Sequence, residues 1–292
     1  MDIKRYKKTI KKTIKKTIKK IIVRKYLILF ILFILFILFI FFIVNYNIDN
    51  TYIEYNNPYI DNDNIKLKWN DINSKFMKDN WPNTFDFDFE IKKDLLDKSL
   101  TLPKNYGIID CGAHIGDGSI PLAHALQYYG REDIIVYAID PSKYKCDFIQ
   151  KIADINDIKN IKVIHYGLSD KDNIEYTYIQ QPLGKNGTIN SGATNWKKKE
   201  ELNNKEEIIQ FIKLDTLIQN NIIKHNIGVI HLDVEGMEIE AVKGGLKCIQ
   251  TYKPYISLED HSNDTSKFID ILNDYEFIKR INSNNTFSPI NS

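Results

Sequence analysis

A strand and a glycine loop are encoded by Ile108-Ile109-Asp110-Cys111-Gly112-Ala113-His114-Ile115-Gly116-Asp117-Gly118-Ser119. Glycines at 112, 116 and 118 permit a tight turn and close approach of a ligand to the backbone. A dinucleotide site prefers the spacing G-x-G-x-x-G, whereas this loop reads G-x-x-x-G-x-G with Asp110 and Asp117 beside it. Such acids favour a cofactor with an ammonium and a sulfonium over one with phosphates. Asp110, Gly112 and Gly116 are therefore candidate cofactor-binding residues; alternatively, the glycines serve chain packing alone.

Apolar runs alternate with helical patterns on both sides of this loop, which predicts a doubly wound α/β domain with a parallel sheet. The predicted strands are Ile108–Cys111, Ile134–Asp140, Ile161–His165, Ile227–Asp233 and Tyr255–Glu259, with further candidates at Glu175–Gln180 and Ile208–Lys213. A short helix is predicted over Glu90–Ser99. Ser119 and Ser142 are predicted to cap helices, and a third helix ends at Gly244-Gly245. The polar loop 182–205 is predicted to be a lid or a recognition loop.

Polar residues follow the predicted strands at the edge where ligands bind in such sheets. Asp140, at the end of the second strand, is expected to accept hydrogen bonds from both ribose hydroxyls of a nucleoside cofactor. Ser169 and Asp170, after the third strand, are expected to meet an adenine edge, unless they only form a turn. These three residues complete the predicted cofactor site.

Three acids, Asp233, Glu235 and Glu238, stand within six residues at the end of the fourth predicted strand. Unpaired carboxylates are costly to bury, so Asp233 and Glu235 are predicted to be catalytic. Glu238 falls in the first turn of the next helix, where a carboxylate is stabilised by the helix dipole. His261, after the fifth strand, is a further candidate base. A magnesium site formed by Asp233, Glu235 and Glu259 is an alternative, although no metal is predicted.

Charge is distributed unevenly along the chain. Residues 1–44 hold 12 basic residues and one acid, which leaves 28 basic and 37 acidic residues, a net charge of −9, in residues 45–292. No nucleic-acid partner is therefore expected for the domain. The three cysteines are too few for a disulfide framework, and without a CxxC motif they do not predict a zinc site.

Residues 26–44 are uncharged and long enough to span a bilayer, which predicts contact with membrane lipid through a signal anchor. The basic tail, residues 1–25, is expected to stay cytosolic, which gives a type II topology with a lumenal domain. A stem is predicted over 45–75, an extension packing on the domain over 76–106, and the catalytic domain over 107–292. Glycosylation acceptors are present at Asn186, Asn263 and Asn284.

Several ordered motifs resemble the FkbM-type S-adenosylmethionine-dependent methyltransferase family. They are Ile109-Asp110-x-Gly112-Ala113-x-Ile115-Gly116, Asp140-Pro141, Leu214-Asp215-Thr216-Leu217 and Leu232-Asp233-Val234-Glu235-Gly236-x-Glu238, with Gly244-Gly245. The resemblance covers about residues 105–262. It implies a Rossmann-like methyltransferase sheet, S-adenosylmethionine as cofactor, and O-methylation of a hydroxyl on a sugar, glycan or other small molecule. Asp140 stands where the family commonly has Glu, and His114 where Asn is common.

Three other classes remain open from the sequence. A nucleotide-dependent oxidoreductase would share the fold, but the glycine spacing argues against it. A type II membrane glycosyltransferase would share the anchor and the alternating strands. A non-catalytic membrane adaptor would leave the acids at the strand ends unexplained.

Overall fold

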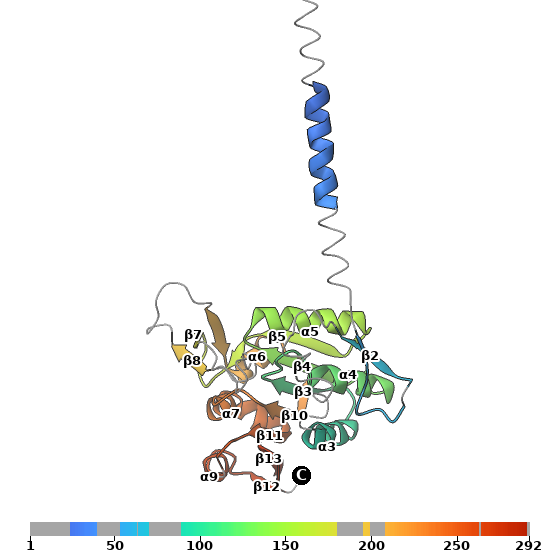
Figure 1. Cartoon of the computed structure of the whole chain (residues 1–292). Helices are drawn as coiled ribbons and strands as arrows, with labels where there is room; N and C mark the ends of the chain where they lie inside the picture. The colour runs from blue at the N-terminus through green and yellow to red at the C-terminus, as the bar shows by residue number, and fades with distance from the viewer. Residues whose placement is uncertain are drawn as a thin grey trace, which may run out of the picture. The chain divides into compact units, whose positions relative to one another are not determined.

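The computed structural model describes residues 24–39, 53–62, 64–69, 89–179, 195–198, 208–262 and 264–290. They belong to two units, Met1–Thr51 and Tyr52–Ser292. In the first unit, residues 24–39 are helical (Figure 1). No helix in the described part of the chain is both long and apolar enough to cross a bilayer. The last residues of the predicted anchor, 40–44, lie outside the described residues.

The second unit is built on a seven-stranded sheet with the order β12-β13-β11-β10-β3-β4-β5. Strands β10, β11, β3, β4 and β5 run parallel, and β13 is antiparallel to both of its neighbours. All five predicted strands of the parallel part are confirmed, and β12 and β13 make the sheet mixed. The strands are β3 (Tyr106–Cys111), β4 (Ile135–Asp140), β5 (Ile161–His165), β10 (Asn226–Leu232), β11 (Tyr255–Glu259), β12 (Tyr275–Ile281) and β13 (Asn284–Pro289).

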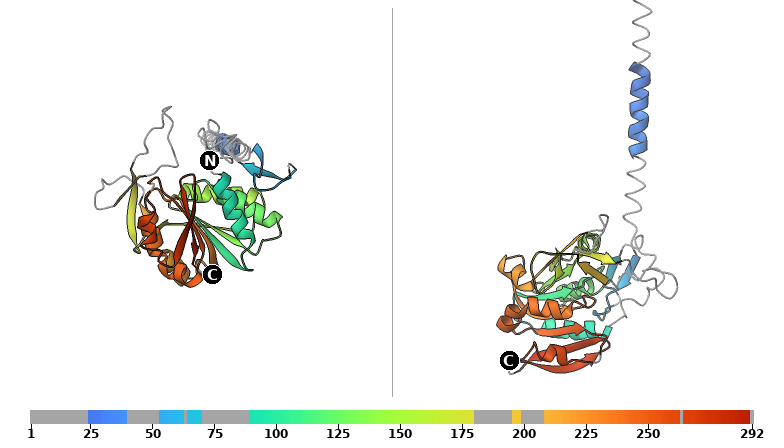
Figure 2. Two further views of the ribbon diagram at one scale, coloured as in Figure 1. Left: turned by 90° about the horizontal axis from the view of Figure 1, so that it is seen from below. Right: turned by 90° about the vertical axis from the view of Figure 1, so that its left-hand side faces the viewer.

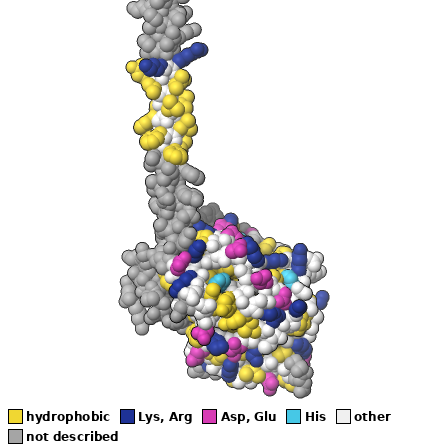
Figure 3. All heavy atoms as spheres, turned by 90° about the vertical axis from the view of Figure 1, so that its right-hand side faces the viewer, with side chains coloured by type: hydrophobic (Ala, Val, Ile, Leu, Met, Phe, Trp, Pro, Cys, Tyr) yellow, Lys and Arg dark blue, Asp and Glu magenta, His cyan; other side chains and the backbone are white. Residues whose placement is uncertain are grey.

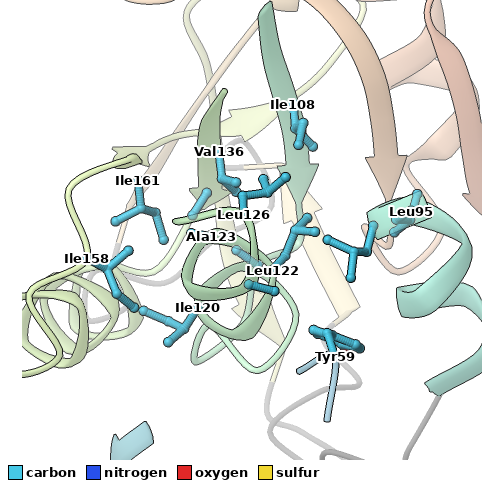
Figure 4. Close-up of a cluster of buried hydrophobic side chains, with 14 of the residues drawn as sticks. Tyr59, Leu95, Ile108, Ile120, Leu122, Ala123, Leu126, Val136, Ile158 and Ile161 are labelled. Carbon is cyan, nitrogen blue, oxygen red and sulfur yellow. The ribbon is translucent and has the colours of Figure 1, made fainter. Parts of the chain in front are cut away.

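Helices cover both faces of this sheet (Figure 2). Successive residues of a strand point to opposite faces, so Ile108 packs in one core cluster and Ile109 in the other. The Ile108 face, shown in Figure 4, is covered by α3 (Phe89–Leu100), α4 (Ser119–Tyr128) and α5 (Lys143–Ile155). The Ile109 face is covered by α6 (Leu214–Gln219), α7 (Glu238–Gly244), α8 (Leu246–Tyr252) and α9 (Ser266–Ile269). Asp110 shares the Ile108 face by the same alternation.

The predicted helix caps differ in detail from those observed. Gly118 is the N-cap of α4, and Ser119 is buried inside its first turn, so the prediction that Ser119 caps this helix is wrong. Its hydroxyl hydrogen-bonds Asp110 instead. Ser142 is the N-cap of α5, but its side chain makes no capping bond. Helix α7 ends at Gly244, as predicted.

The segment predicted as a stem contributes to the core of the second unit. Strands β1 (Ile53–Asn56) and β2 (Lys66–Trp69) form an antiparallel hairpin. Trp69 is buried, with its ring 5.9 Å from that of Phe148. The Asn57 side-chain amide donates to the carbonyl of Pro121 at 2.9 Å. The described part of this segment is thus folded against the domain, because it carries apolar side chains that the domain buries. Phe76, Trp81, Phe85 and Phe87, in the predicted extension that follows, lie outside the described residues.

A second sheet has the order β6-β9-β7-β8. Its strands are β6 (Gly167–Leu168), β7 (Ile174–Ile179), β8 (Asn195–Lys198) and β9 (Ile209–Ile212). The two predicted strand candidates correspond to β7 and β9. Of the predicted polar loop 182–205, only β8 is described, and it pairs with β7.

One predicted glycosylation acceptor is inaccessible. Asn284 is buried in β13 and lies 3.3 Å from the Ser257 hydroxyl. Thr286 of the same motif is also buried, so the folded chain does not present this motif to a modifying enzyme. Asn186 and Asn263 lie outside the described residues.

Candidate active site

Polar side chains gather at one edge of the main sheet, where β4, β3, β10 and β11 end. These four strands are neighbours and run parallel, so their carboxyl ends share this edge. The glycine loop follows β3, Asp140 ends β4, Asp233 follows β10 and Glu259 ends β11. The structure therefore brings together residues that are far apart in the sequence.

The glycines of the loop allow chain segments to approach closely. Gly112 has a φ of +81°, and a Cβ atom there would lie 1.6 Å from the carbonyl oxygen of Asp233. Gly116 has a φ of +85°, and a Cβ atom there would lie 2.8 Å from Ile120 Cγ1 and 3.1 Å from Ile149 Cγ1. Chain packing therefore requires both glycines, and their predicted contact with a cofactor stays a prediction.

Asp110 is held by two partners within the chain. Its Oδ1 accepts a hydrogen bond from His231 Nδ1 at 2.8 Å, and its Oδ2 accepts one from the Ser119 hydroxyl. His231 lies opposite Asp110 in the pairing of β10 with β3. His231 does not stand out in the sequence, because it lies inside an apolar strand and its pairing with Asp110 follows only from the register of the two strands.

Asp140 is buried at the end of β4. Its two oxygens accept hydrogen bonds from the backbone amides of His114 at 2.9 Å and Ser142 at 2.8 Å. Burial raises the pKa of Asp140, although Lys145 Nζ, 4.0 Å away, opposes the shift. A carboxylate has about four lone-pair sites, so each oxygen retains capacity for one further donor. Lys145 was not singled out from the sequence.

Ser169 and Asp170 follow β6, just beyond β5. Ser169 is buried, its amide donates to the carbonyl of Ile212 at 3.0 Å, and its hydroxyl lies 3.4 Å from Asp170 Oδ1. A Cβ atom on Gly244 would lie 2.0 Å from the Ser169 carbonyl oxygen. The structure thus shows packing for Ser169, and the predicted contact with adenine stays a prediction.

Asp233 and Glu259 form a carboxyl pair at the ends of β10 and β11. Burial raises the pKa of Asp233, and its hydrogen bond with Glu259 raises it further. Two hydrogen-bonded carboxyl groups share one proton and one negative charge, so neither oxygen pair is freely available to a substrate proton, which weakens the case for Asp233 as the catalytic base.

Glu235 differs from the other acids at this edge. It is half-buried and has no hydrogen-bond partner among the described residues. Burial raises its pKa to about 7, with a contribution from the charge of Asp233. Its φ is +53°, a backbone conformation that is uncommon for side chains with a Cβ atom and that is found at functional sites.

Glu238 closes the turn that carries Glu235. Its Oε1 accepts hydrogen bonds from the amides of Val234 at 3.2 Å and Gly236 at 3.1 Å. The Glu238 carboxylate is therefore occupied in shaping the backbone, as its position in the first turn of α7 predicts.

A pocket of 220 Å³ lies beside this turn. Its lining includes Glu235, Glu238, Glu259, His261 and Lys267. The His261 side chain is 74% exposed, and its Nε2 lies 3.6 Å from Glu259 Oε1. Lys267 Nζ is 2.8 Å from Asp260 Oδ1, an ion pair at the rim.

Metal binding gains no support from this edge. Within the described residues, no three His, Cys, Asp or Glu side chains are arranged to hold a metal ion.

On the face in Figure 3, basic and acidic side chains are interspersed rather than gathered by sign.

The family model of the methyltransferase FkbM domain matches residues 110–280. This range contains the glycine loop, Asp140, Asp233 and the residues that line the pocket. No curated protein matches the chain in sequence.

Solved structures resemble this chain only distantly. They include the methyltransferase FkbM from Methylobacillus flagellatus KT, with 20% identity over 65% of this chain and a TM-score of 0.42; this chain spans only 45% of that protein. The precorrin-6y C5,15-methyltransferase from Geobacter metallireducens GS-15 has 12% identity over 70% of this chain and 88% of its own, with a TM-score of 0.40. A SAM-dependent methyltransferase from Aquifex aeolicus has 12% identity over 74% of this chain and 97% of its own, with a TM-score of 0.39.

Proposed function

Because the chain belongs to the methyltransferase FkbM family, we propose that it transfers a methyl group from S-adenosylmethionine to a hydroxyl group of a sugar or another small molecule. The observation that carries the proposal is the position of Glu235. This carboxylate is free of hydrogen bonds within the described residues, lines a pocket, and has a pKa of about 7. It follows the end of β10, next to the glycine loop at the end of β3.

The donor set at the sheet edge fits the cofactor. Asp110, Asp117 and Asp140 place acidic groups around the loop, which suits a ligand with an ammonium and a sulfonium. Asp140 retains lone pairs for the ribose hydroxyls. When bound, S-adenosylmethionine supplies an electrophilic methyl group on a positively charged sulfur.

The acceptor side requires a group that takes up a proton. A Glu235 carboxylate oxygen would orient the acceptor hydroxyl and take up its proton as that oxygen is methylated. General base catalysis works best when the pKa of the base lies near the operating pH, which favours Glu235 over the proton-sharing Asp233.

Asp140→Ala is expected to weaken the affinity for S-adenosylhomocysteine by at least about tenfold, because two ribose hydroxyls lose a charged partner. Calorimetric titration of each variant with S-adenosylhomocysteine measures this affinity. Asp147→Ala is the matched control, since Asp147 pairs with Lys143 at the exposed surface of the following helix. Equal affinities for wild type and Asp140→Ala would place the nucleoside elsewhere.

A transfer assay tests the proposed reaction. The full chain is incubated with S-adenosylmethionine labelled on its methyl group and with a panel of monosaccharides, glycans and small alcohols. We expect label in at least one acceptor as a base-stable ether. Transfer of sugar from a sugar nucleotide, or hydride exchange with a nicotinamide cofactor, would support the glycosyltransferase or the oxidoreductase instead.

The membrane location is a separate proposal, supported by the charge asymmetry of the sequence. Residues 26–44 would contact membrane lipid, with the catalytic domain on the lumenal side. Alkaline extraction of membranes tests the anchor, and protease protection tests on which side of the membrane the catalytic domain lies. Release of the full chain by carbonate would contradict the anchor.

A further inference from the structure

Two ion pairs border the glycine loop on the Ile108 face of the sheet. His231 Nδ1 lies 2.8 Å from Asp110 Oδ1, and Lys92 Nζ lies 3.1 Å from Asp117 Oδ2. Both pairs are largely shielded from solvent, with side-chain exposures of 16% and 9% in the first pair and 12% and 22% in the second. They come from different elements: Lys92 from α3, Asp110 from β3, His231 from β10 and Asp117 from the loop.

His231 keeps one ring nitrogen uncommitted. Nδ1 donates to Asp110, whereas Nε2 has no hydrogen-bond partner among the described residues and is not among the buried polar atoms left unsatisfied. Nε2 is therefore reached by solvent or by a ligand. Burial lowers the pKa of His231, but its bond to Asp110 and the charges of Asp110 and Asp233 outweigh burial, so the pKa lies above its usual value. When His231 is protonated, its Nε2–H is the ring donor that Asp110 does not use.

Two shielded ion pairs are not explained by stability alone. The desolvation cost of such pairs offsets much of their attraction, and apolar residues of similar size often do as well. The four groups instead place two positive and two negative charges around one loop. An α-amino acid end carries both an ammonium and a carboxylate, so it is complementary to such an arrangement.

We propose that Lys92 and His231 form a subsite for the carboxylate of the cofactor's amino acid end, with Asp117 beside its ammonium. This inference rests on the proposed function, because it assigns one end of the proposed cofactor. Lys92 would supply a point charge and His231 Nε2 a directed hydrogen bond. Asp110 holds the ring of His231 in place, and Ser119 holds Asp110, which explains why both oxygens of Asp110 are occupied.

The test compares two ligands that differ only in that carboxylate. S-adenosylhomocysteine and its decarboxylated analogue, which retains the adenosine, the sulfur and the amine, are titrated calorimetrically into the full chain. Wild type is expected to bind S-adenosylhomocysteine at least about tenfold more tightly, since a charge-assisted hydrogen bond is worth about that factor or more.

Lys92→Gln is expected to reduce this preference about tenfold by weakening only the complete ligand. Lys93→Gln is the matched control, because Lys93 is the next residue of α3 and pairs at the exposed surface with Asp97. His231→Gln is expected to act in the same direction as Lys92→Gln. Because both side chains are largely buried, thermal melting checks the fold of each variant, and whichever of the two variants keeps the wild-type melting temperature carries the test.

Three outcomes distinguish this inference from the proposed function. Equal binding of both ligands to wild type would overturn the carboxylate subsite and leave the methyltransferase proposal standing. Equal losses for both ligands in Lys92→Gln would assign Lys92 to structure and would also overturn the subsite. Binding of neither ligand to folded wild type would overturn the proposed function together with the subsite.

Discussion

Glu235→Gln is expected to lower kcat for methyl transfer by about a hundredfold or more, while the affinity for S-adenosylhomocysteine stays within about twofold. Glutamine keeps the shape of the side chain but cannot take up the acceptor's proton. Glu235 has no hydrogen bond to lose among the described residues, so the fold should tolerate the change. The measurement is single-turnover transfer with any acceptor found in the panel.

The pH profile adds a second readout. Glu235 must be ionised to act as a base, and its pKa is raised to about 7. In wild type, the rate is therefore expected to fall as the pH drops below about 7 and to level off above it. Glu235→Gln should lose this dependence.

Glu238→Gln is the matched control on the same turn. Its carboxylate accepts the amides of Val234 and Gly236, and the glutamine oxygen can still accept them. We expect modest loss of stability and near-normal turnover. Full activity in Glu235→Gln with an inactive Glu238→Gln would show that the two roles are reversed. Activity in both would direct the search to His261 or to the loop at 182–205.

Gly112→Ala is expected to destabilise the domain by roughly 3 kcal/mol or more. A Cβ atom there would lie 1.6 Å from the Asp233 carbonyl oxygen, so backbone must move, and the φ of +81° is unfavourable for alanine. Overpacking and a left-handed backbone each cost about 1–3 kcal/mol. Donor binding should also be lost, because the displaced strand ends carry the acids of the site. Urea denaturation measures the free energy of unfolding.

Gly130→Ala separates the two causes of that loss. Gly130 also has a positive φ, +73°, but a Cβ atom there would meet nothing within 4 Å. The substitution should cost about 1–2 kcal/mol from the backbone alone. If Gly112→Ala costs no more than Gly130→Ala, the close approach to Asp233 is not a constraint on the fold.

The parallel strands could be predicted from the sequence because strands buried on both faces read as continuous apolar runs. Ile161–His165 and Tyr255–Glu259 match their predicted bounds. Strand β12 could not be predicted in this way, because its five central residues are exposed and carry no apolar period. The hairpin β1–β2 lies in the segment predicted as a stem, because its short strands are buried only by residues far along the chain, such as Pro121 and Phe148.

The acids of the site could be predicted in position but not in role. Parallel strands end at a common edge, which placed Asp110, Asp140, Asp233 and Glu235 together. Whether a carboxylate already has hydrogen-bond partners within the chain depends on strand register and backbone conformation. Asp110 pairs with His231 across 121 positions of sequence, and the positive φ of Glu235 is not encoded in any local pattern.

Titration of the full chain with S-adenosylhomocysteine, with NAD and a sugar nucleotide run in parallel, tests the central claim most directly. We predict saturable one-to-one binding of S-adenosylhomocysteine and no heat of binding with either of the other two ligands. Binding of NAD or of the sugar nucleotide by folded protein that does not bind S-adenosylhomocysteine would contradict the methyltransferase assignment of this site.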